Sequence, residues 1–306
     1  MSNAILKESI MKLGFLTNYS QEIVRFASAD PSFNCLEISG PPMEWTGDTD
    51  QAQAARLGAL NLLRENGLTV SSFLIQWPSI RTSKDDLTGE LGRLGQIMDV
   101  CKVMDNAIMA GAGPLGYDPE ISLEGNVARY KEIYSPVADL AESKGIKVAF
   151  ENWPGDRRSG PFGDGASLAV TPEIWGLMFE AVPSSVMGLE LDPSHLIWQK
   201  IDAHAALNEF ADRVHIIHAK DTEIFDSRVK HDGIFRRSSS GWGHWGRYRL
   251  PGFAHFDWQK LLAMCHERQI ECPVVIEHED PVFSGDRRLE GLTRSGKFLK
   301  NCLLQA

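Results

Sequence analysis

Four hydrophobic segments in the second half of the sequence each carry a carboxylate or an imidazole near their C-terminal end. The four residues are Glu151, Asp192, His218 and Glu277. Alternate residues of an extended strand face opposite sides. In each segment one face is largely apolar and suits packing against helices, and the polar residue falls on the other face. Because burying an isolated carboxylate is costly unless its charge is compensated, we expect these side chains to share one site that contains a cation.

Three carboxylates and one imidazole form a donor set typical of hard divalent cations. Such ligands suit Mn²⁺, Mg²⁺ or Co²⁺ better than they suit metals that prefer thiolates. The sequence therefore predicts one divalent ion held by all four residues. A single Asp or Glu at a strand end is also typical of a helix cap or a solvated turn. Four in succession favour the metal, because caps do not follow strand alternation.

Two further residues near these strand ends are candidates for catalysis. His195 follows Asp192 and Pro193, so the chain can turn there and bring the imidazole back over the site. Lys220 shares the inward face with His218. We expect Lys220 to stabilise an oxyanion or to bind an acidic group of the substrate. The alternative is a salt bridge with an inward carboxylate.

Other side chains are candidates for substrate contacts. Arg249, in "RYRLPG", is predicted to bind substrate, with a solvated loop charge as the alternative. Glu190 is either a partner of a metal ligand or a buried residue of the barrel.

Flat apolar rings bind the C–H faces of sugars. Five tryptophans follow strand ends or lie in a long loop: Trp77, Trp153, Trp198, Trp242 and Trp245. Of these, Trp153 and Trp245 are the predicted substrate contacts.

Short β-rich segments alternate with helical patterns along the chain. The predicted strands span 12–18, 34–39, 68–75, 106–111, 147–152, 185–192, 214–220 and 273–278. The predicted helices span 20–29, 50–66, 88–104, 121–144, 171–181, 202–211, 257–270 and 288–304. This pattern predicts an α/β protein, a (β/α)8 TIM barrel that forms a single domain over 1–306. The rival is an open doubly wound sheet, but "GFLTNYSQ" lacks the Gly-rich turn that such a sheet usually places after its first strand.

One long insertion, 221–256, follows the seventh predicted strand. Its Gly, Ser and Arg content indicates a loop. Connections of this length in compact domains are usually functional. We therefore expect 221–256 to cover the C-terminal mouth of the barrel and to supply substrate contacts.

Five short motifs stand out around the strand ends, and they are "AFENWPG", "ELDPSHL", "HAKD", "RLPGFAHFDW" and "VVIEHED". They resemble those of the sugar phosphate isomerase/epimerase superfamily, the xylose isomerase-like TIM barrels, whose members include D-tagatose 3-epimerase and inosose dehydratase. The resemblance implies one divalent metal, often manganese. Its implied ligands are Glu151, Asp192, His218 and Glu277. The resemblance also implies that His195 contacts substrate oxygens.

The function predicted from these residues is that of a divalent-metal-dependent isomerase or epimerase. It would act on a sugar or keto-sugar by abstracting a proton next to a carbonyl. Glu151 and Glu277 are the predicted acid/base pair, with His195 orienting a substrate hydroxyl and Lys220 balancing the oxyanion. The chain shows no Gly-rich phosphate cradle, which favours an unphosphorylated substrate.

Two alternatives remain open. A metal-dependent lyase or dehydratase would begin with the same proton abstraction and then expel a leaving group from a keto-sugar, an inosose or a 3-keto-glycoside. The order His218-Ala219-Lys220-Asp221 leaves this reading open, because epimerases of the tagatose type continue differently after the metal histidine. A non-catalytic sugar-binding protein is the third reading, but such a protein need not retain both candidate proton-transfer glutamates.

Composition limits the partners and the location. The net charge of −10 disfavours nucleic acid. The barrel also resembles endonuclease IV, whose extra zinc-binding histidines are absent from "IQWPS" and "AGAGP". No apolar run reaches membrane-spanning length, and the first ten residues do not resemble a signal peptide. Five widely spaced cysteines favour buried thiols in a reducing cytoplasm. The expected partners are a small carbohydrate and, at most, further copies of this chain.

Overall fold

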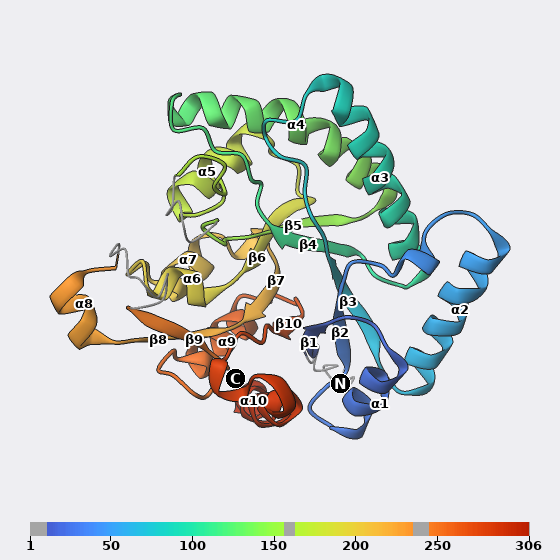
Figure 1. The fold of residues 1–306 in the computed structure, drawn as a ribbon, viewed down its shortest axis with the longest axis vertical. Coiled ribbons are helices and arrows are strands. Elements are labelled where there is room, and N and C mark those ends of the chain that lie inside the picture. The colour runs from blue at the N-terminus through green and yellow to red at the C-terminus, as the bar shows by residue number, and fades with distance from the viewer. Residues whose placement is uncertain (1–10, 156–162, 235–244, 306) are drawn as a thin grey trace, which may run out of the picture.

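The computed structural model describes residues 11–155, 163–234 and 245–305. Eight parallel strands close into a barrel in the order β1-β10-β7-β6-β5-β4-β3-β2, which confirms the predicted (β/α)8 TIM barrel. Helices surround the strands (Figure 1). The barrel strands are β1 (Leu13–Thr17), β2 (Cys35–Ser39), β3 (Thr69–Leu74), β4 (Ile108–Ala112), β5 (Lys147–Glu151), β6 (Met187–Leu191), β7 (Val214–Ala219) and β10 (Val274–Ile276). The helices outside the long insertion are α1 (Gln21–Ala29), α2 (Asp50–Glu65), α3 (Lys84–Val103), α4 (Leu123–Lys144), α5 (Pro172–Ala181), α6 (Pro193–Ile197), α7 (Ala203–Glu209), α9 (Trp258–Glu267) and α10 (Arg288–Gln305).

The interior of the barrel is divided into an apolar part and a polar part. A small inner core of buried apolar side chains consists of Ile108, Ala110, Ala149, Ile216 and Val275. The much larger second core contains the opposite faces of the strands, including Val148, Phe150 and Leu189. Further along the inward faces, toward the C-terminal ends of the strands, the side chains become carboxylates and imidazoles. The alternation read from the sequence therefore positions polar groups inside the barrel at its C-terminal end.

Two register shifts interrupt the barrel, and each lies beside a buried carboxylate. Between β2 and β3 the shift falls between Leu36 and Glu37. Between β6 and β7 it falls between Leu189 and Glu190. Because an extra residue in one strand re-aims the side chains around it, both irregularities help to set the direction of the glutamates that follow them.

The long insertion is more ordered than its composition suggested. β8 (Asp221–Ile224) and β9 (Gly246–Arg249) form an antiparallel two-stranded sheet, and α8 (Asp226–Asp232) lies between them in sequence. The prediction of a plain loop was therefore wrong at both ends of 221–256. The Gly- and Ser-rich composition belongs to the middle of the insertion, and 235–244, with Trp242, lies outside the described residues.

None of the described helices has the length and apolar character needed to cross a membrane. All five cysteines are buried free thiols. Burial raises the pKa of the Cys35 thiol to about 12. The packing agrees with the prediction of buried thiols without disulfides.

Candidate active site

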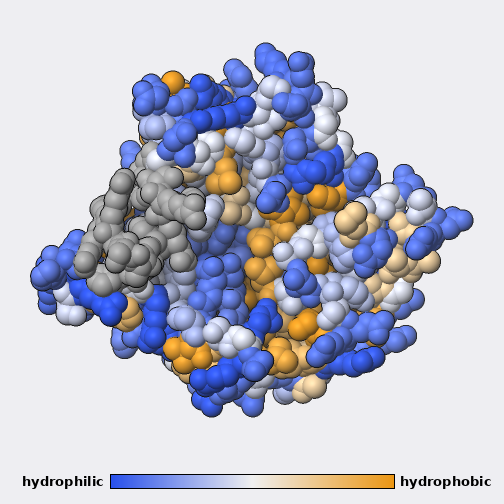
Figure 2. Space-filling model, viewed as in Figure 1, coloured by the Kyte–Doolittle hydropathy of each residue, from blue (hydrophilic) through white to orange (hydrophobic). Residues whose placement is uncertain are grey.

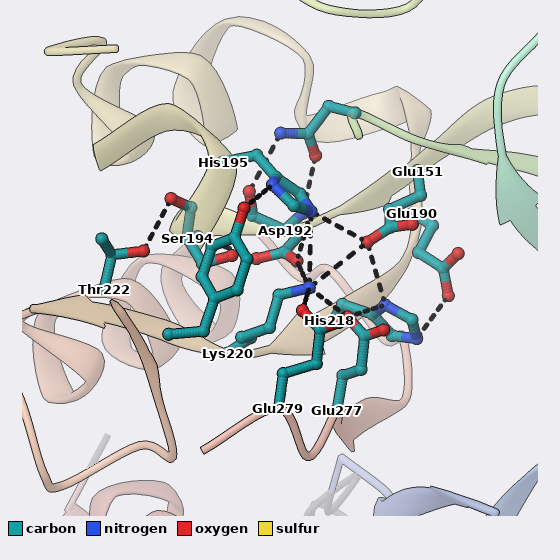
Figure 3. Close-up of polar contacts among 12 residues, drawn as sticks. Glu151, Glu190, Asp192, Ser194, His195, His218, Lys220, Thr222, Glu277 and Glu279 are labelled. Carbon is teal, nitrogen blue, oxygen red and sulfur yellow. Dashed lines mark hydrogen bonds and ion pairs between the residues drawn. The ribbon is translucent and has the colours of Figure 1, made fainter. Parts of the chain in front are cut away.

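The structure brings the four predicted metal ligands together at the C-terminal end of the barrel. Glu151 is the last residue of β5, Asp192 follows β6, His218 lies in β7, and Glu277 follows β10. One potential ligand atom of each lies within 4.8 Å of those of the other three. Figure 3 shows these side chains converging on one region, with Lys220 among them.

His218 presents a different nitrogen to each side of the site. Its Nε2 lies 2.6 Å from Glu37 Oε2 and 2.9 Å from Glu190 Oε1. Its Nδ1 lies 3.5 Å from Glu151 Oε1 and 3.4 Å from Glu277 Oε2, is buried, and makes no hydrogen bond. A hydrogen on Nε2 leaves the Nδ1 lone pair free, which is the arrangement that metal-binding histidines need. A divalent ion therefore fits this donor set.

Glu37 is an inward-facing carboxylate to which the sequence analysis gave no role. It lies on β2 and crosses the barrel to reach His218, and Ser72 Oγ donates a hydrogen bond of 2.9 Å to its Oε1. Its inward position on the strand was visible in the sequence, but no pattern linked it to β7. For Glu190, the contact with His218 supports the reading as a partner of a ligand.

Asp192 combines the two roles that were weighed against each other for strand-end carboxylates. Its Oδ1 accepts a hydrogen bond from Ser194 N at 2.8 Å and so caps α6. Its Oδ2 lies 3.1 Å from Lys220 Nζ and 3.3 Å from His195 Nε2. The backbone of Asp192 is held by the Asn152 side chain, which donates to its carbonyl at 2.9 Å and accepts from its amide at 2.8 Å. One oxygen is thus fixed by the helix while the other faces the site.

Lys220 is a buried cation surrounded by carboxylates. Its ammonium hydrogen-bonds Glu277, lies 3.1 Å from Glu279 Oε2, and lies 3.8 Å from Glu151 Oε1. It also sits 4.8 Å from the centre of the Tyr248 ring. The salt-bridge alternative from the sequence is therefore present in the structure, and the ammonium still faces the space between the predicted ligands.

His195 lies between the metal-ligand cluster and the β8–β9 sheet. Its Nε2 is 3.2 Å from Glu151 Oε1, and its Nδ1 is 3.1 Å from the Tyr248 hydroxyl. The side chain is fully buried. α6 starts at Pro193, so the turn predicted after Asp192 is the first turn of a short helix that returns His195 over the site.

The pKa directions follow from burial and from this mixture of charges. Burial raises the pKa of Glu190 well above its usual range, and the nearby Glu37 adds to the effect. Burial opposes ionisation of Glu277 as well, but Lys220 outweighs it and lowers the pKa to about 2. Burial opposes ionisation of Glu151 too, but its hydrogen bond with His195 and the nearby His218 and Lys220 hold its pKa well below the usual range. Glu151 and Glu277 are therefore ionised at neutral pH, whereas Glu190 favours its protonated form.

The two basic groups have their charged forms stabilised. Burial disfavours charge on Lys220, but Asp192 and Glu277 hold its pKa well above the usual range. Burial likewise opposes charge on His218, whose pKa is held well above the usual range by Glu190 and Glu37. Because a metal ligand must be deprotonated, an ion that binds at Nδ1 would release a proton from His218.

The remaining predicted substrate contacts lie in different surroundings. Arg249 is buried, with Nε 2.8 Å from Asp280 Oδ2 and Nη1 2.8 Å from Glu223 Oε2, so it is not a solvated loop charge. Trp245 is buried against Trp198, with ring centres 5.5 Å apart. Trp153 is half-buried just after β5. The substrate contacts of Arg249, Trp153 and Trp245 stay predictions.

Comparison with known proteins identifies the family. Residues 27–302 match the family described as xylose isomerase-like TIM barrel. Inosose dehydratase of Clostridium beijerinckii is 24% identical over 164 residues, which cover 53% of this chain and 49% of that protein. The match therefore spans about half the length of that relative.

Solved structures resemble nearly the whole chain. D-psicose 3-epimerase with D-tagatose, from Clostridium cellulolyticum H10, has a TM-score of 0.70 and 14% identity, covering 96% of this chain and 99% of that one. The probable 3-DHS dehydratase AsbF of Bacillus anthracis has a TM-score of 0.68 and 13% identity, covering 95% and 99%. At such identities the likeness shows the shared fold. Proteins with this fold include epimerases, dehydratases and isomerases.

Proposed function

The chain belongs to the xylose isomerase-like TIM barrel family, and from this premise we propose that it is a divalent-metal-dependent isomerase or epimerase of a sugar or keto-sugar. The observation that carries the proposal is His218 Nδ1, which is buried and makes no hydrogen bond while facing Glu151 and Glu277. A buried polar atom without a partner is unfavourable unless a ligand satisfies it.

Glu151, Asp192, His218 and Glu277 are the residues that would hold the ion, with Mn²⁺ as the first choice and Mg²⁺ or Co²⁺ as alternatives. When bound, such an ion supplies Lewis-acid stabilisation of the charge that develops on a substrate oxygen. Lys220 places a second positive charge beside the same carboxylates, 3.1 Å from Asp192 Oδ2, where it can stabilise an oxyanion.

Proton transfer is assigned to Glu151 and Glu277. Both are ionised at neutral pH, so each can accept a proton from carbon or return one. They come from β5 and β10, which are not neighbours in the barrel, so they approach a bound sugar from different sides. His195, 3.2 Å from Glu151, can orient the substrate hydroxyl next to the reacting carbon.

A β-elimination on a keto-sugar is the second candidate, favoured by the similarity to inosose dehydratase. The same base removes the proton, and the carboxyl group so formed can then pass that proton to the leaving oxygen, which departs as water or an alcohol. Epimerisation returns the proton to carbon, whereas elimination loses water or an alcohol.

Isotope exchange tests the assignment of the base. The protein, loaded with Mn²⁺, is incubated in D₂O with ketoses, inositol ketones and 3-keto-glycosides, and deuterium in carbon positions is followed by NMR. We expect Glu151→Gln and Glu277→Gln each to reduce exchange by about 100-fold or more, the scale of lost general acid–base catalysis. Glu173→Gln, at an exposed position of α5, is the control.

The outcome also separates the candidate functions. Exchange without loss of water or an alcohol supports epimerisation, and loss of water or an alcohol supports elimination. A protein that binds a sugar without exchange would be the non-catalytic binder. Wild-type exchange in both Gln variants would move the base elsewhere, with His195 examined first.

A further inference from the structure

A cavity of about 460 Å³ lies next to the candidate active site. It opens around the end of β1 and the segment that follows β10, and its wall includes Glu277, one of the predicted metal ligands. On the face drawn in Figure 2 the centre of the molecule is hollowed, with hydrophilic residues in the hollow and hydrophobic residues along one side. The volume lies in the range of small-molecule binding sites.

Arg288, the first residue of α10, lines this cavity and has no carboxylate partner among the described residues. Its guanidinium donates one hydrogen bond, from Nη2 to the Leu16 carbonyl at 2.9 Å. The residue is half-buried, and burial lowers the pKa of Arg288 with no opposing carboxylate. By contrast, the neighbouring Arg287 is exposed and pairs with Glu290 at 3.0 Å. A half-buried guanidinium that leaves most of its donors unused is poised for an acceptor from outside the chain.

The rest of the wall is rich in polar groups. His278 has a buried Nε2 that makes no hydrogen bond within the described part of the chain. Asn18, Tyr19 and Ser39 add an amide and two hydroxyls. Two carboxylates also line the cavity, Glu277 and Glu279, but both contact the Lys220 ammonium. One ammonium offsets only part of the charge of this acidic wall, and Arg288 is the cation of the wall that pairs with no carboxylate among the described residues.

We propose that this cavity is a subsite for an anionic group of the substrate, a carboxylate or a phosphate, which Arg288 binds. The inference rests on the proposed function, since it places the reacting carbon near Glu277 and the anionic group at Arg288. Guanidinium matches the geometry of both anions through two parallel hydrogen bonds. The subsite would therefore favour an acidic sugar over a neutral one, and binding of a sugar phosphate would correct the expectation of an unphosphorylated substrate.

A matched set of three probes tests the subsite without turnover. Glycerol, D-glycerate and glycerol 3-phosphate are titrated into the Mg²⁺-loaded protein, and affinities are measured by NMR. We expect one of the two anions to bind roughly tenfold or more tightly than glycerol, the scale of a charge-assisted hydrogen bond. The better anion identifies the group. Arg288→Gln should abolish the preference and Arg288→Lys should keep part of it, whereas Arg287→Gln should leave it unchanged.

A second measurement avoids mutation, in case Arg288→Gln does not fold. Phenylglyoxal labels accessible arginines, and mass spectrometry then reports whether Arg288 in the wild-type protein is protected by the better anion but not by glycerol. Equal binding of all three probes, or a preference that persists in Arg288→Gln, would overturn the subsite. Both readouts are independent of isotope exchange, so a failed catalytic proposal and a failed subsite are distinguishable.

Discussion

At the scale of single residues, the hydrogen on His218 Nε2 has more acceptors than it can use. Glu37 and Glu190 both approach this nitrogen, at 2.6 and 2.9 Å. One N–H satisfies one carboxylate, so the second carboxyl must avoid a negative charge. Glu190, whose oxygens make no hydrogen bond, fits the protonated partner, and Glu37, which also accepts from Ser72, fits the acceptor of the Nε2 hydrogen.

This division of roles predicts unequal effects of two similar substitutions. Glu37→Gln removes the carboxyl group that holds the His218 tautomer, and we expect it to weaken Mn²⁺ binding by about 10- to 100-fold, the range for groups that orient metal ligands. Glu190→Gln replaces a neutral acid with a neutral amide and should change the affinity much less. Calorimetric titration of both variants with Mn²⁺ checks the contrast. A larger loss in Glu190→Gln would reverse the assignment.

Metal binding itself is tested at His218. His218→Ala should lose the ion from protein purified without chelator, while His266→Ala, an exposed histidine of α9, should retain it. Elemental analysis of both variants and of the wild-type protein gives the result. Equal metal content in all three proteins would refute the predicted ligand set.

The convergence of these residues could be predicted because strand alternation is a local property. Placing Glu151, Asp192, His218 and Glu277 on the inward faces needed only the sequence within each strand. The contact between Glu37 and His218 could not be found in this way. It joins residues 181 positions apart, on strands that are not neighbours in the barrel, and exists only because the barrel closes.

At the scale of elements, the β8–β9 sheet is attached to the candidate site at several points. Thr222 Oγ1 donates to the Ser194 carbonyl at 2.8 Å, and the Tyr248 hydroxyl contacts His195. Arg249 joins β9 to Asp280, whose Oδ2 also accepts from Leu250 N at 3.2 Å. The sheet therefore supports the helix that carries His195.

Arg249→Met should destabilise the protein because it leaves the Asp280 carboxylate buried without its partner. We expect a loss of about 3 kcal/mol in the free energy of unfolding, as for other broken buried pairs. Arg247→Met, which removes the more exposed pair with Glu223, should cost less than about 1 kcal/mol. Denaturant unfolding measures both. If Arg249→Met instead weakened ligand binding with unchanged stability, the predicted substrate contact would be its role.

The elements themselves were largely predictable from local patterns, with two informative errors. α3 begins at Lys84, earlier than the predicted start at 88, because Ser83 accepts a hydrogen bond from Asp86 N and caps the helix. The apolar periodicity alone does not report this cap. The β8–β9 pairing was missed because it joins two short strands across more than twenty residues, and no local pattern marks such a pair.

At the scale of the whole molecule, the burial of ionisable side chains in the closed barrel makes the stability of the fold depend on pH. At their C-terminal ends the strands carry many ionisable side chains on their inward faces, and these belong to the site. The N-terminal end of β7 carries a separate one, His215, which is buried and whose Nε2 lies 3.2 Å from the Val186 carbonyl. Burial lowers the pKa of His215 from 6.5 to about 4, and Lys147 adds to the effect.

The sign of the stability change follows from this direction. Between pH 4 and 6.5 the unfolded chain binds a proton at His215 and the folded barrel does not, so stability rises with pH in this window. On acidification from pH 7 to 4, His215 should therefore cost the fold roughly 3 kcal/mol. His215→Gln removes this contribution, while the carboxylates titrate alike in both proteins. The stability of the wild type relative to His215→Gln should thus fall by that amount between pH 7 and 4, as measured by denaturant unfolding. The control is His231→Gln, at a side chain that is 84% exposed, and it should have the same dependence of stability on pH as the wild type. If the wild type and His215→Gln instead lost stability in parallel between pH 7 and 4, His215 would be protonated in the folded barrel.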